Sequence, residues 1–161
     1  MLCKRYLVVS CLLVSQIGCE SDVPWDMVKV SGKVTYEDGT LIPASAIRLS
    51  FKSLAPPINS KVHPRPGRVS VNVEDGTFEN VTTHKYGDGL IVGKHKVLVV
   101  ALASESGQES SQVVPEDYTT SSATPIEIDT ADSPLHIKVA KPLLSGRLEN
   151  FSNASGQFAG R

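Results

Sequence analysis

The chain has 161 residues, of which 40% are hydrophobic and 20% charged, so its composition is that of an ordinary globular protein with about one domain. Its formal net charge is −1 and its Lys and Arg residues form no basic stripe, so we expect no nucleic-acid partner. Aromatic residues make up only 6%, which leaves Val, Ile and Leu to build the core.

The first 18 residues have the three parts of a signal peptide. Lys4 and Arg5 give a positive start, an apolar run follows from Leu7 to Val14, and small or polar residues end the segment. A membrane-spanning helix needs about 20 apolar residues, so this run is too short to be one. We therefore expect residues 1–18 to be removed on export, which leaves 14 basic and 17 acidic side chains.

All three cysteines lie in the first 19 residues, so the rest of the chain has neither a disulfide nor a thiolate metal site. Ile17-Gly18-Cys19 resembles the lipobox of bacterial lipoproteins, in which a small residue precedes the lipidated cysteine. The resemblance implies that Cys19 is the lipidation site and that residues 19–27 form a lipidated tether on the cell envelope. By analogy with the known sorting rules of such lipoproteins, Glu20 in place of Asp after the lipidated cysteine favours the outer membrane over the inner one. The alternative is an ordinary signal peptide in which Cys19 has no role.

Short alternating segments follow in the first half of the mature chain. Apolar residues at every second position predict strands over Val28–Tyr36 and Ala44–Phe51, with Ile47, Leu49 and Phe51 facing inward in the second. Gly32 lies inside the first strand, where a missing side chain often marks a bulge or the close approach of another chain segment. Asp38-Gly39 supplies the left-handed backbone that a tight turn requires.

A proline-rich loop separates the second strand from the third. Ser53–Gly67 contains four prolines, which cannot donate a hydrogen bond to a sheet. Long loops without secondary structure are uncommon and are functional or mobile. We therefore expect this loop to contact a partner, with Pro56, Pro57, His63 and Arg65 as the candidate residues.

The second half contains the most apolar strand. Arg68–Val73 and Phe78–Val81 flank Asp75-Gly76 and predict a hairpin. The stretch Gly87–Ala101 then begins with a turn and becomes apolar on both faces from Val97, so we expect this strand to be covered on both sides or along much of its length.

The remaining segments complete an all-β domain. Pro115 interrupts Val113–Tyr118, Ile126 and Ile128 begin a short strand, and Leu135, Ile137 and Val139 form the last strand. No segment of ten or more residues has helical periodicity. The pattern predicts an antiparallel, seven-stranded β-sandwich over residues 28–141 and a loose tail over residues 142–161.

The order of these motifs resembles that of carboxypeptidase regulatory-like domains. Their strand–turn–strand opening is similar to residues 30–35, 38–44 and 47–51 here. Three later segments also match: Asp75–Phe78, Gly93–Val97 and the Val-Pro-x-x-Tyr of Val114–Tyr118. The resemblance covers most of residues 29–141 and implies a Greek-key sandwich like that of transthyretin (prealbumin), in a lipoprotein of the bacterial envelope. The family shares a fold and not a reaction.

No residue set in the sequence carries recognisable catalytic chemistry. His63, His84, His95 and His136 lack the spacing of a metal site, and no Gly-x-Ser-x-Gly motif occurs. Each Asp-Gly pair is a turn in preference to a Ca²⁺ ligand. We expect no enzyme, cofactor or metal, and a function in adhesion, scaffolding or recognition of an envelope protein. A carbohydrate-binding module that takes a glycan is the alternative, and a hydrolase on a transthyretin-like fold is the third.

Overall fold

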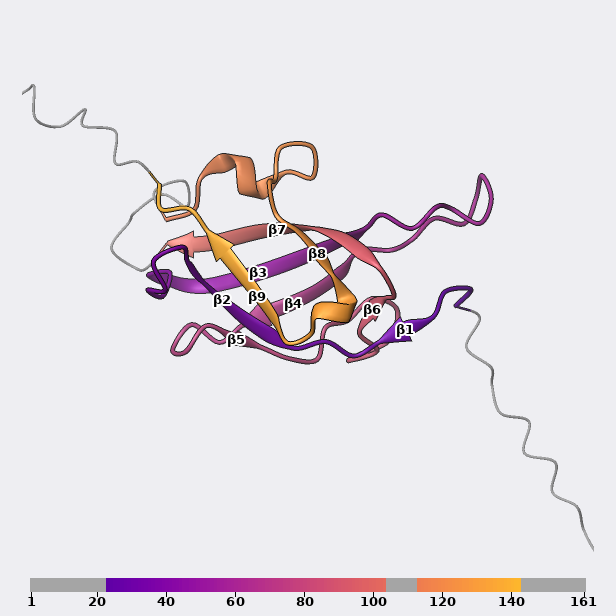
Figure 1. The fold of residues 1–161 in the computed structure, drawn as a ribbon, viewed down its shortest axis with the longest axis horizontal. Helices are drawn as coiled ribbons and strands as arrows, with labels where there is room; N and C mark the ends of the chain where they lie inside the picture. Colours follow the sequence, from indigo (N-terminus) through magenta and orange to yellow (C-terminus); the bar gives the residue numbers. More distant parts are fainter. Residues whose placement is uncertain (1–22, 104–112, 143–161) are drawn as a thin grey trace, which may run out of the picture.

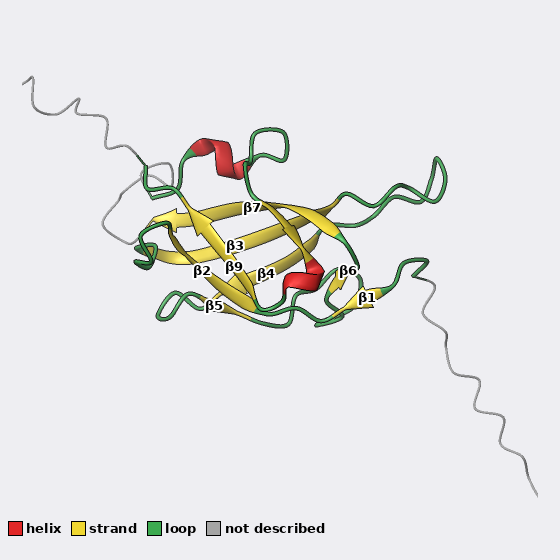
Figure 2. Cartoon of the chain, in the orientation of Figure 1, coloured by secondary structure: helices red, strands yellow, loops and turns green. Residues whose placement is uncertain are grey.

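The computed structural model describes residues 23–103 and 113–142, so the predicted signal peptide, Cys19 and residues 143–161 of the predicted tail lie outside the described residues. The described part is all-β (Figures 1 and 2). Its strands are β1 (Met27–Val28), β2 (Gly32–Tyr36), β3 (Ala44–Ser53), β4 (Gly67–Val71), β5 (Thr77–Phe78), β6 (Leu90–Ile91), β7 (Lys94–Ala103), β8 (Glu127–Asp129) and β9 (Leu135–Val139). Two short 3₁₀ helices, η2 (Glu116–Thr119) and η3 (Thr130–Asp132), flank β8.

The strands form two main sheets and one small one. Antiparallel pairs build the order β4-β3-β7-β8, the second sheet has the order β5-β2-β9, and β1 pairs with β6. In Figure 1, β9 runs obliquely across β3 where the two main sheets overlap. The arrangement is consistent with the expected β-sandwich. The folded part begins slightly earlier than residue 28, because Met27 pairs with Ile91 and the Asp26 carbonyl accepts a hydrogen bond from Val92.

The core lies between the main sheets and comes from the alternation that the sequence predicted. Ile47, Leu49 and Phe51 of β3 are buried, as are Val97 and Val99 of β7. The facing sheet contributes Val34, Tyr36, Phe78, Leu135, Ile137 and Val139. The rings of Phe51 and Phe78 have their centroids 5.9 Å apart and join the two layers.

The prediction of a wholly antiparallel sandwich was wrong for one pair of strands. β2 and β9 run parallel from Gly32↔Leu135 to Tyr36↔Val139. Alternation fixes which side chains face inward but not the direction of a distant partner strand, so the sequence pattern could not distinguish the two cases. The described residues also form two more strands than the seven expected, β1 and β6, which have only two residues each and show no alternation.

The predicted hairpin around Asp75-Gly76 was also partly wrong. β5 pairs with β2 of the other sheet, at Gly32↔Phe78 and Lys33↔Thr77. Among the described residues, the two sides of the predicted hairpin are joined only by the isolated bridge Arg68↔Thr82 and by a hydrogen bond of 2.8 Å from the Asn72 amide to the Thr77 carbonyl next to the turn. The turn itself forms as expected, but it carries the chain from one sheet to the other, where Phe78 enters the core.

The expectation that β7 is covered on both faces was wrong. His95, Val97, Val99 and Ala101 face the core, whereas Val100 and Leu102 are 44% and 59% exposed. Leu98 is half-buried. The outer face of this sheet is therefore open and partly apolar in the described part of the chain.

Candidate functional site

Residues 54–66 form an arm that joins β3 to β4 and projects beyond the end of their sheet (Figure 1). Its tip is held by local hydrogen bonds. The Ile58 amide donates to the Val62 carbonyl over 3.1 Å, and the Asn59 side chain accepts from the amides of Lys61 and Val62 over 2.8 and 2.9 Å. The arm therefore has a defined turn at its end.

The arm exposes apolar side chains as well as the predicted contact residues. Leu54, Ile58 and Val62 are 44%, 55% and 37% exposed. The structure places all four predicted contact residues, Pro56, Pro57, His63 and Arg65, on the surface of the arm. His63 also has its Nε2 atom 3.2 Å from the Ser60 carbonyl oxygen. Contact of these four residues with a partner stays a prediction.

The arm and its two strands form a basic segment in an otherwise slightly acidic chain. Residues 39–73 contain five cationic side chains and no Asp or Glu: Arg48, Lys52, Lys61, Arg65 and Arg68. Unlike the scattered charges elsewhere, these gather on one hairpin. Anionic groups are therefore attracted to this part of the surface.

A groove of about 480 Å³ lies beside the hairpin. The side chains that argue for a binding site here are Arg48 of β3, Arg68 of β4 and Tyr86, and the wall is completed by Val69, Ser70, Glu79, Asn80 and Thr82. Tyr86 is 86% exposed. Among the described residues, neither arginine side chain has a hydrogen-bond or ion-pair partner. Sequence reasoning missed this groove, although both arginines occupy outward positions of strands that flank one loop.

Asp88 fixes the loop that carries Tyr86. Its carboxylate accepts hydrogen bonds from the amides of Thr83, His84 and Lys85, each 2.8 Å long. Partial burial alone would raise the pKa of Asp88, but the three amides stabilise the charged form and the pKa is lowered. Gly89 is required next to it, because a Cβ there would lie 2.0 Å from the Val28 carbonyl oxygen.

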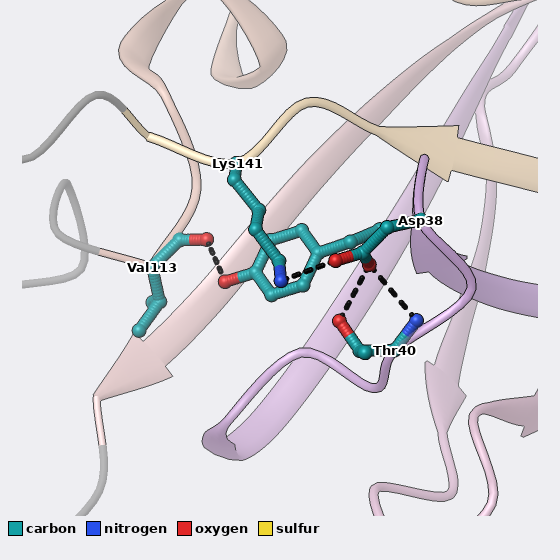
Figure 3. Close-up of polar contacts among 5 residues, drawn as sticks. Asp38, Thr40, Val113 and Lys141 are labelled. Carbon is teal, nitrogen blue, oxygen red and sulfur yellow. Dashed lines mark hydrogen bonds and ion pairs between the residues drawn. The ribbon is translucent and has the colours of Figure 1, made fainter.

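A second polar cluster ties the turn after β2 to the residues that follow β9 (Figure 3). Lys141 forms an ion pair with Asp38 and lies 5.3 Å from the centre of the Tyr36 ring, while the Tyr36 hydroxyl donates to the Val113 carbonyl over 2.8 Å. Hydrogen bonds from Lys141 and Thr40 lower the pKa of Asp38. Burial, with a smaller contribution from Asp38, raises the pKa of Tyr36. All these groups have partners, so the cluster is structural.

The Asp-Gly turns have the local chemistry expected of turns. Asp38 Oδ1 accepts from the amide and hydroxyl of Thr40, and Asp75 Oδ1 accepts from the same two groups of Thr77. These bonds lower the pKa of Asp75 as well. In residues 23–103 and 113–142, no three His, Cys, Asp or Glu side chains are placed to hold a metal ion.

The histidines occupy four separate environments. His95 is buried, with Nδ1 3.0 Å from the Gly93 carbonyl oxygen, whereas His63 and His136 are exposed. His84 has its Nε2 atom buried with no hydrogen-bond partner among the described residues.

Tyr118 anchors the segment that contains η2 to the end of β9. It is buried at η2, and its hydroxyl accepts a hydrogen bond from the Ala140 amide over 3.1 Å. It therefore fastens the segment before β8 to the end of β9. The helical segments of the described part are too short and too polar to cross a membrane.

Comparison of the chain with models of known protein families, with curated proteins and with solved structures found no match.

Proposed function

We propose that this protein is a non-enzymatic lipoprotein of the cell envelope that recognises a protein partner through the arm at residues 54–66. The observation that carries the proposal is the arm itself. It has a defined turn and exposes Leu54, Ile58 and Val62 on a projection that adds nothing to the core. Exposed apolar side chains next to cations are typical of a protein-contact surface.

The proposed architecture is the Greek-key sandwich of carboxypeptidase regulatory-like domains. The positions of the matching motifs support it. Gly32 lies in β2 next to β9, Asp75-Gly76 makes the crossing between the sheets, and Gly93 precedes the central strand β7. The motifs thus lie at the junctions that determine the path of the chain.

Affinity capture from envelope extracts tests the arm. The full chain in mild detergent is compared with an Ile58→Ser/Val62→Ser variant and with Val92→Ser, a control in which an apolar side chain 54% exposed elsewhere is changed. We expect the same protein to be captured by the wild type and the control and to be lost from the arm variant. Equal capture by all three would refute the role of the arm.

Lipidation of Cys19 has a direct test. Incorporation of labelled palmitate is measured in the wild type, in Cys19→Ala and in Cys11→Ala, which changes another leader cysteine. We expect label to be lost only from Cys19→Ala, because an acyl chain needs that thiol. Equal labelling of all three proteins would refute Cys19 as the lipidation site.

The carbohydrate-binding alternative gains one observation, the exposed ring of Tyr86 beside two arginines without partners. The described residues give no support to the hydrolase.

A further inference from the structure

We propose that the groove between Arg48, Arg68 and Tyr86 binds an acidic saccharide, with its anionic group on the arginines and a sugar ring against the tyrosine. The inference does not depend on the arm, because the groove lies over the sheet and uses other residues. The anionic group is a carboxylate or a sulfate, and the experiment below distinguishes them.

The two arginines are placed to share one anionic ligand. Arg48 pairs with Ser70 and Arg68 with Ser50, so the arginines are diagonal neighbours on the outer face, with Cα atoms about 7–8 Å apart. Like charges at this spacing repel each other, and in the described structure no acidic group is paired with either. An anion between them removes the repulsion and accepts from both guanidinium groups.

The tyrosine supplies a flat apolar surface. At 86%, Tyr86 has the most exposed large hydrophobic side chain in the described part. Its loop does not depend on the ring, because Asp88 binds three of its amides and Thr83 Oγ1 donates to the Gly89 carbonyl over 2.6 Å. An exposed ring on a fixed loop suits the C–H face of a sugar, whose partial positive charge packs on the negative face of the aromatic system.

The remaining polar groups of the groove favour a sugar. Glu79 and Asn80 line the same groove and are exposed, so they can accept and donate hydrogen bonds to hydroxyl groups. The bridge Arg68↔Thr82 holds this wall of the groove against β4, since both backbone hydrogen bonds are formed, at 2.8 and 2.9 Å.

Calorimetric titration of the full chain in mild detergent tests the proposal. The probes are oligogalacturonate for a carboxylate, heparin oligosaccharide for a sulfate, and the neutral methyl ester of oligogalacturonate as the matched control ligand. We expect binding of at least one of the two acidic probes and none of the ester. Arg48→Ala or Arg68→Ala should each weaken binding at least about tenfold, because each removes a charge-assisted hydrogen bond.

Substitutions of Tyr86 measure the contribution of ring stacking separately from that of the arginine charges. Tyr86→Ala should weaken binding several-fold, whereas Tyr86→Phe, which keeps the ring, should bind like the wild type. Lys138→Ala, which removes an exposed cation on β9, should also leave binding unchanged, and each variant is checked for an unaltered thermal unfolding curve.

Four outcomes would overturn the proposal. They are no binding of either acidic probe, equal binding of the methyl ester, equal loss of binding in Lys138→Ala, and arginine-dependent binding to inorganic phosphate or phosphatidylglycerol vesicles without binding of a saccharide. None of these outcomes bears on capture of a protein by the arm.

Discussion

His95 is the polar side chain most deeply placed in the core, at 1% exposure. Burial lowers its pKa from 6.5, and the hydrogen bond to the Gly93 carbonyl and the charge of Asp129 offset this only in part. The imidazole is therefore held in its neutral form in the folded protein. Since the unfolded chain takes up a proton at the ordinary pKa, folding competes with protonation of this residue.

The free energy of unfolding should depend on pH through His95. Neutral His95 should make its full contribution to the free energy of unfolding above pH 6.5, the ordinary pKa. This contribution should be lost as the pH falls toward the lower folded-state pKa, because the unfolded state binds more protons in that window. Urea unfolding of the wild type and of His95→Gln at a series of pH values measures this slope. The variant should have a shallower slope, and the exposed His136→Gln should keep that of the wild type. Equal slopes in wild type and His95→Gln would contradict the assignment.

Asp88→Ala should loosen the loop under Tyr86. The variant leaves the amides of Thr83, His84 and Lys85 without their acceptor, which we expect to cost about 1–2 kcal/mol of unfolding free energy, the size of a lost helix cap. Thermal unfolding gives the stability, and amide exchange at the three positions shows the local effect. Asp132→Ala, which removes an exposed acidic side chain at the end of η3, is the control. Unchanged exchange at residues 83–85 would show that the carboxylate does not hold the loop.

At the scale of elements, the length of a strand determined how well the sequence could predict it. β3 has ten residues, so its alternation identified Ile47, Leu49 and Phe51 as core residues. β5 has two residues, and its partner was assigned wrongly because the nearest candidate in sequence, β4, is not the strand it pairs with. Register against a distant strand is set by tertiary packing, which a local pattern does not contain.

The two candidate surfaces, the arm and the groove, also differ in how far the sequence could predict them. Four prolines are enough to predict the arm from the sequence, because proline excludes a paired strand directly. The groove depends on three separate segments coming together: β3, β4 and the loop fixed by Asp88. Arg48 and Arg68 could have been paired from the outward positions of a predicted hairpin, but the exposure of Tyr86 follows from the loop conformation alone.

Gly32→Ala should separate β2 from its neighbours. A Cβ at this position would lie 2.3 Å from the Leu135 carbonyl oxygen and 2.7 Å from the Phe78 ring. We expect a loss of about 1–3 kcal/mol, the usual cost of overpacking, in chemical unfolding. Lys33→Ala, at the exposed neighbouring position, should change stability little. A Gly32→Ala protein as stable as the wild type would show that β9 can shift without cost.

At the scale of the whole molecule, the two main sheets are joined by a core of mostly aliphatic side chains with few rings. Phe51 is fully buried and Phe78 is 2% exposed, and each comes from a different layer. Their tilted contact is thus the aromatic link between the sheets. Loss of this contact should therefore destabilise both sheets together.

Phe51→Ala should destabilise the protein by about 3–5 kcal/mol, through lost burial and the cavity left behind. In a double-mutant cycle with Phe78→Ala, the coupling should be about 0.5–1.5 kcal/mol, as for aromatic pairs in contact. Chemical unfolding of the four proteins supplies the numbers, and Lys138→Ala on the outer face of β9 serves as a control for substitution alone. A coupling of zero would mean that the two sheets are held independently of this pair.

The parallel pairing of β2 with β9 also bears on how quickly the chain reaches its fold. The first residue of β2, Gly32, finds its partner at Leu135, and its other neighbour, β5, supplies only two residues. Folding must therefore close a loop of about a hundred residues before this ladder forms, and such high contact order slows folding to about milliseconds to seconds. A ribosome-bound chain that ends before residue 135 has no partner for most of β2, so the sheet cannot be completed until synthesis has passed β9.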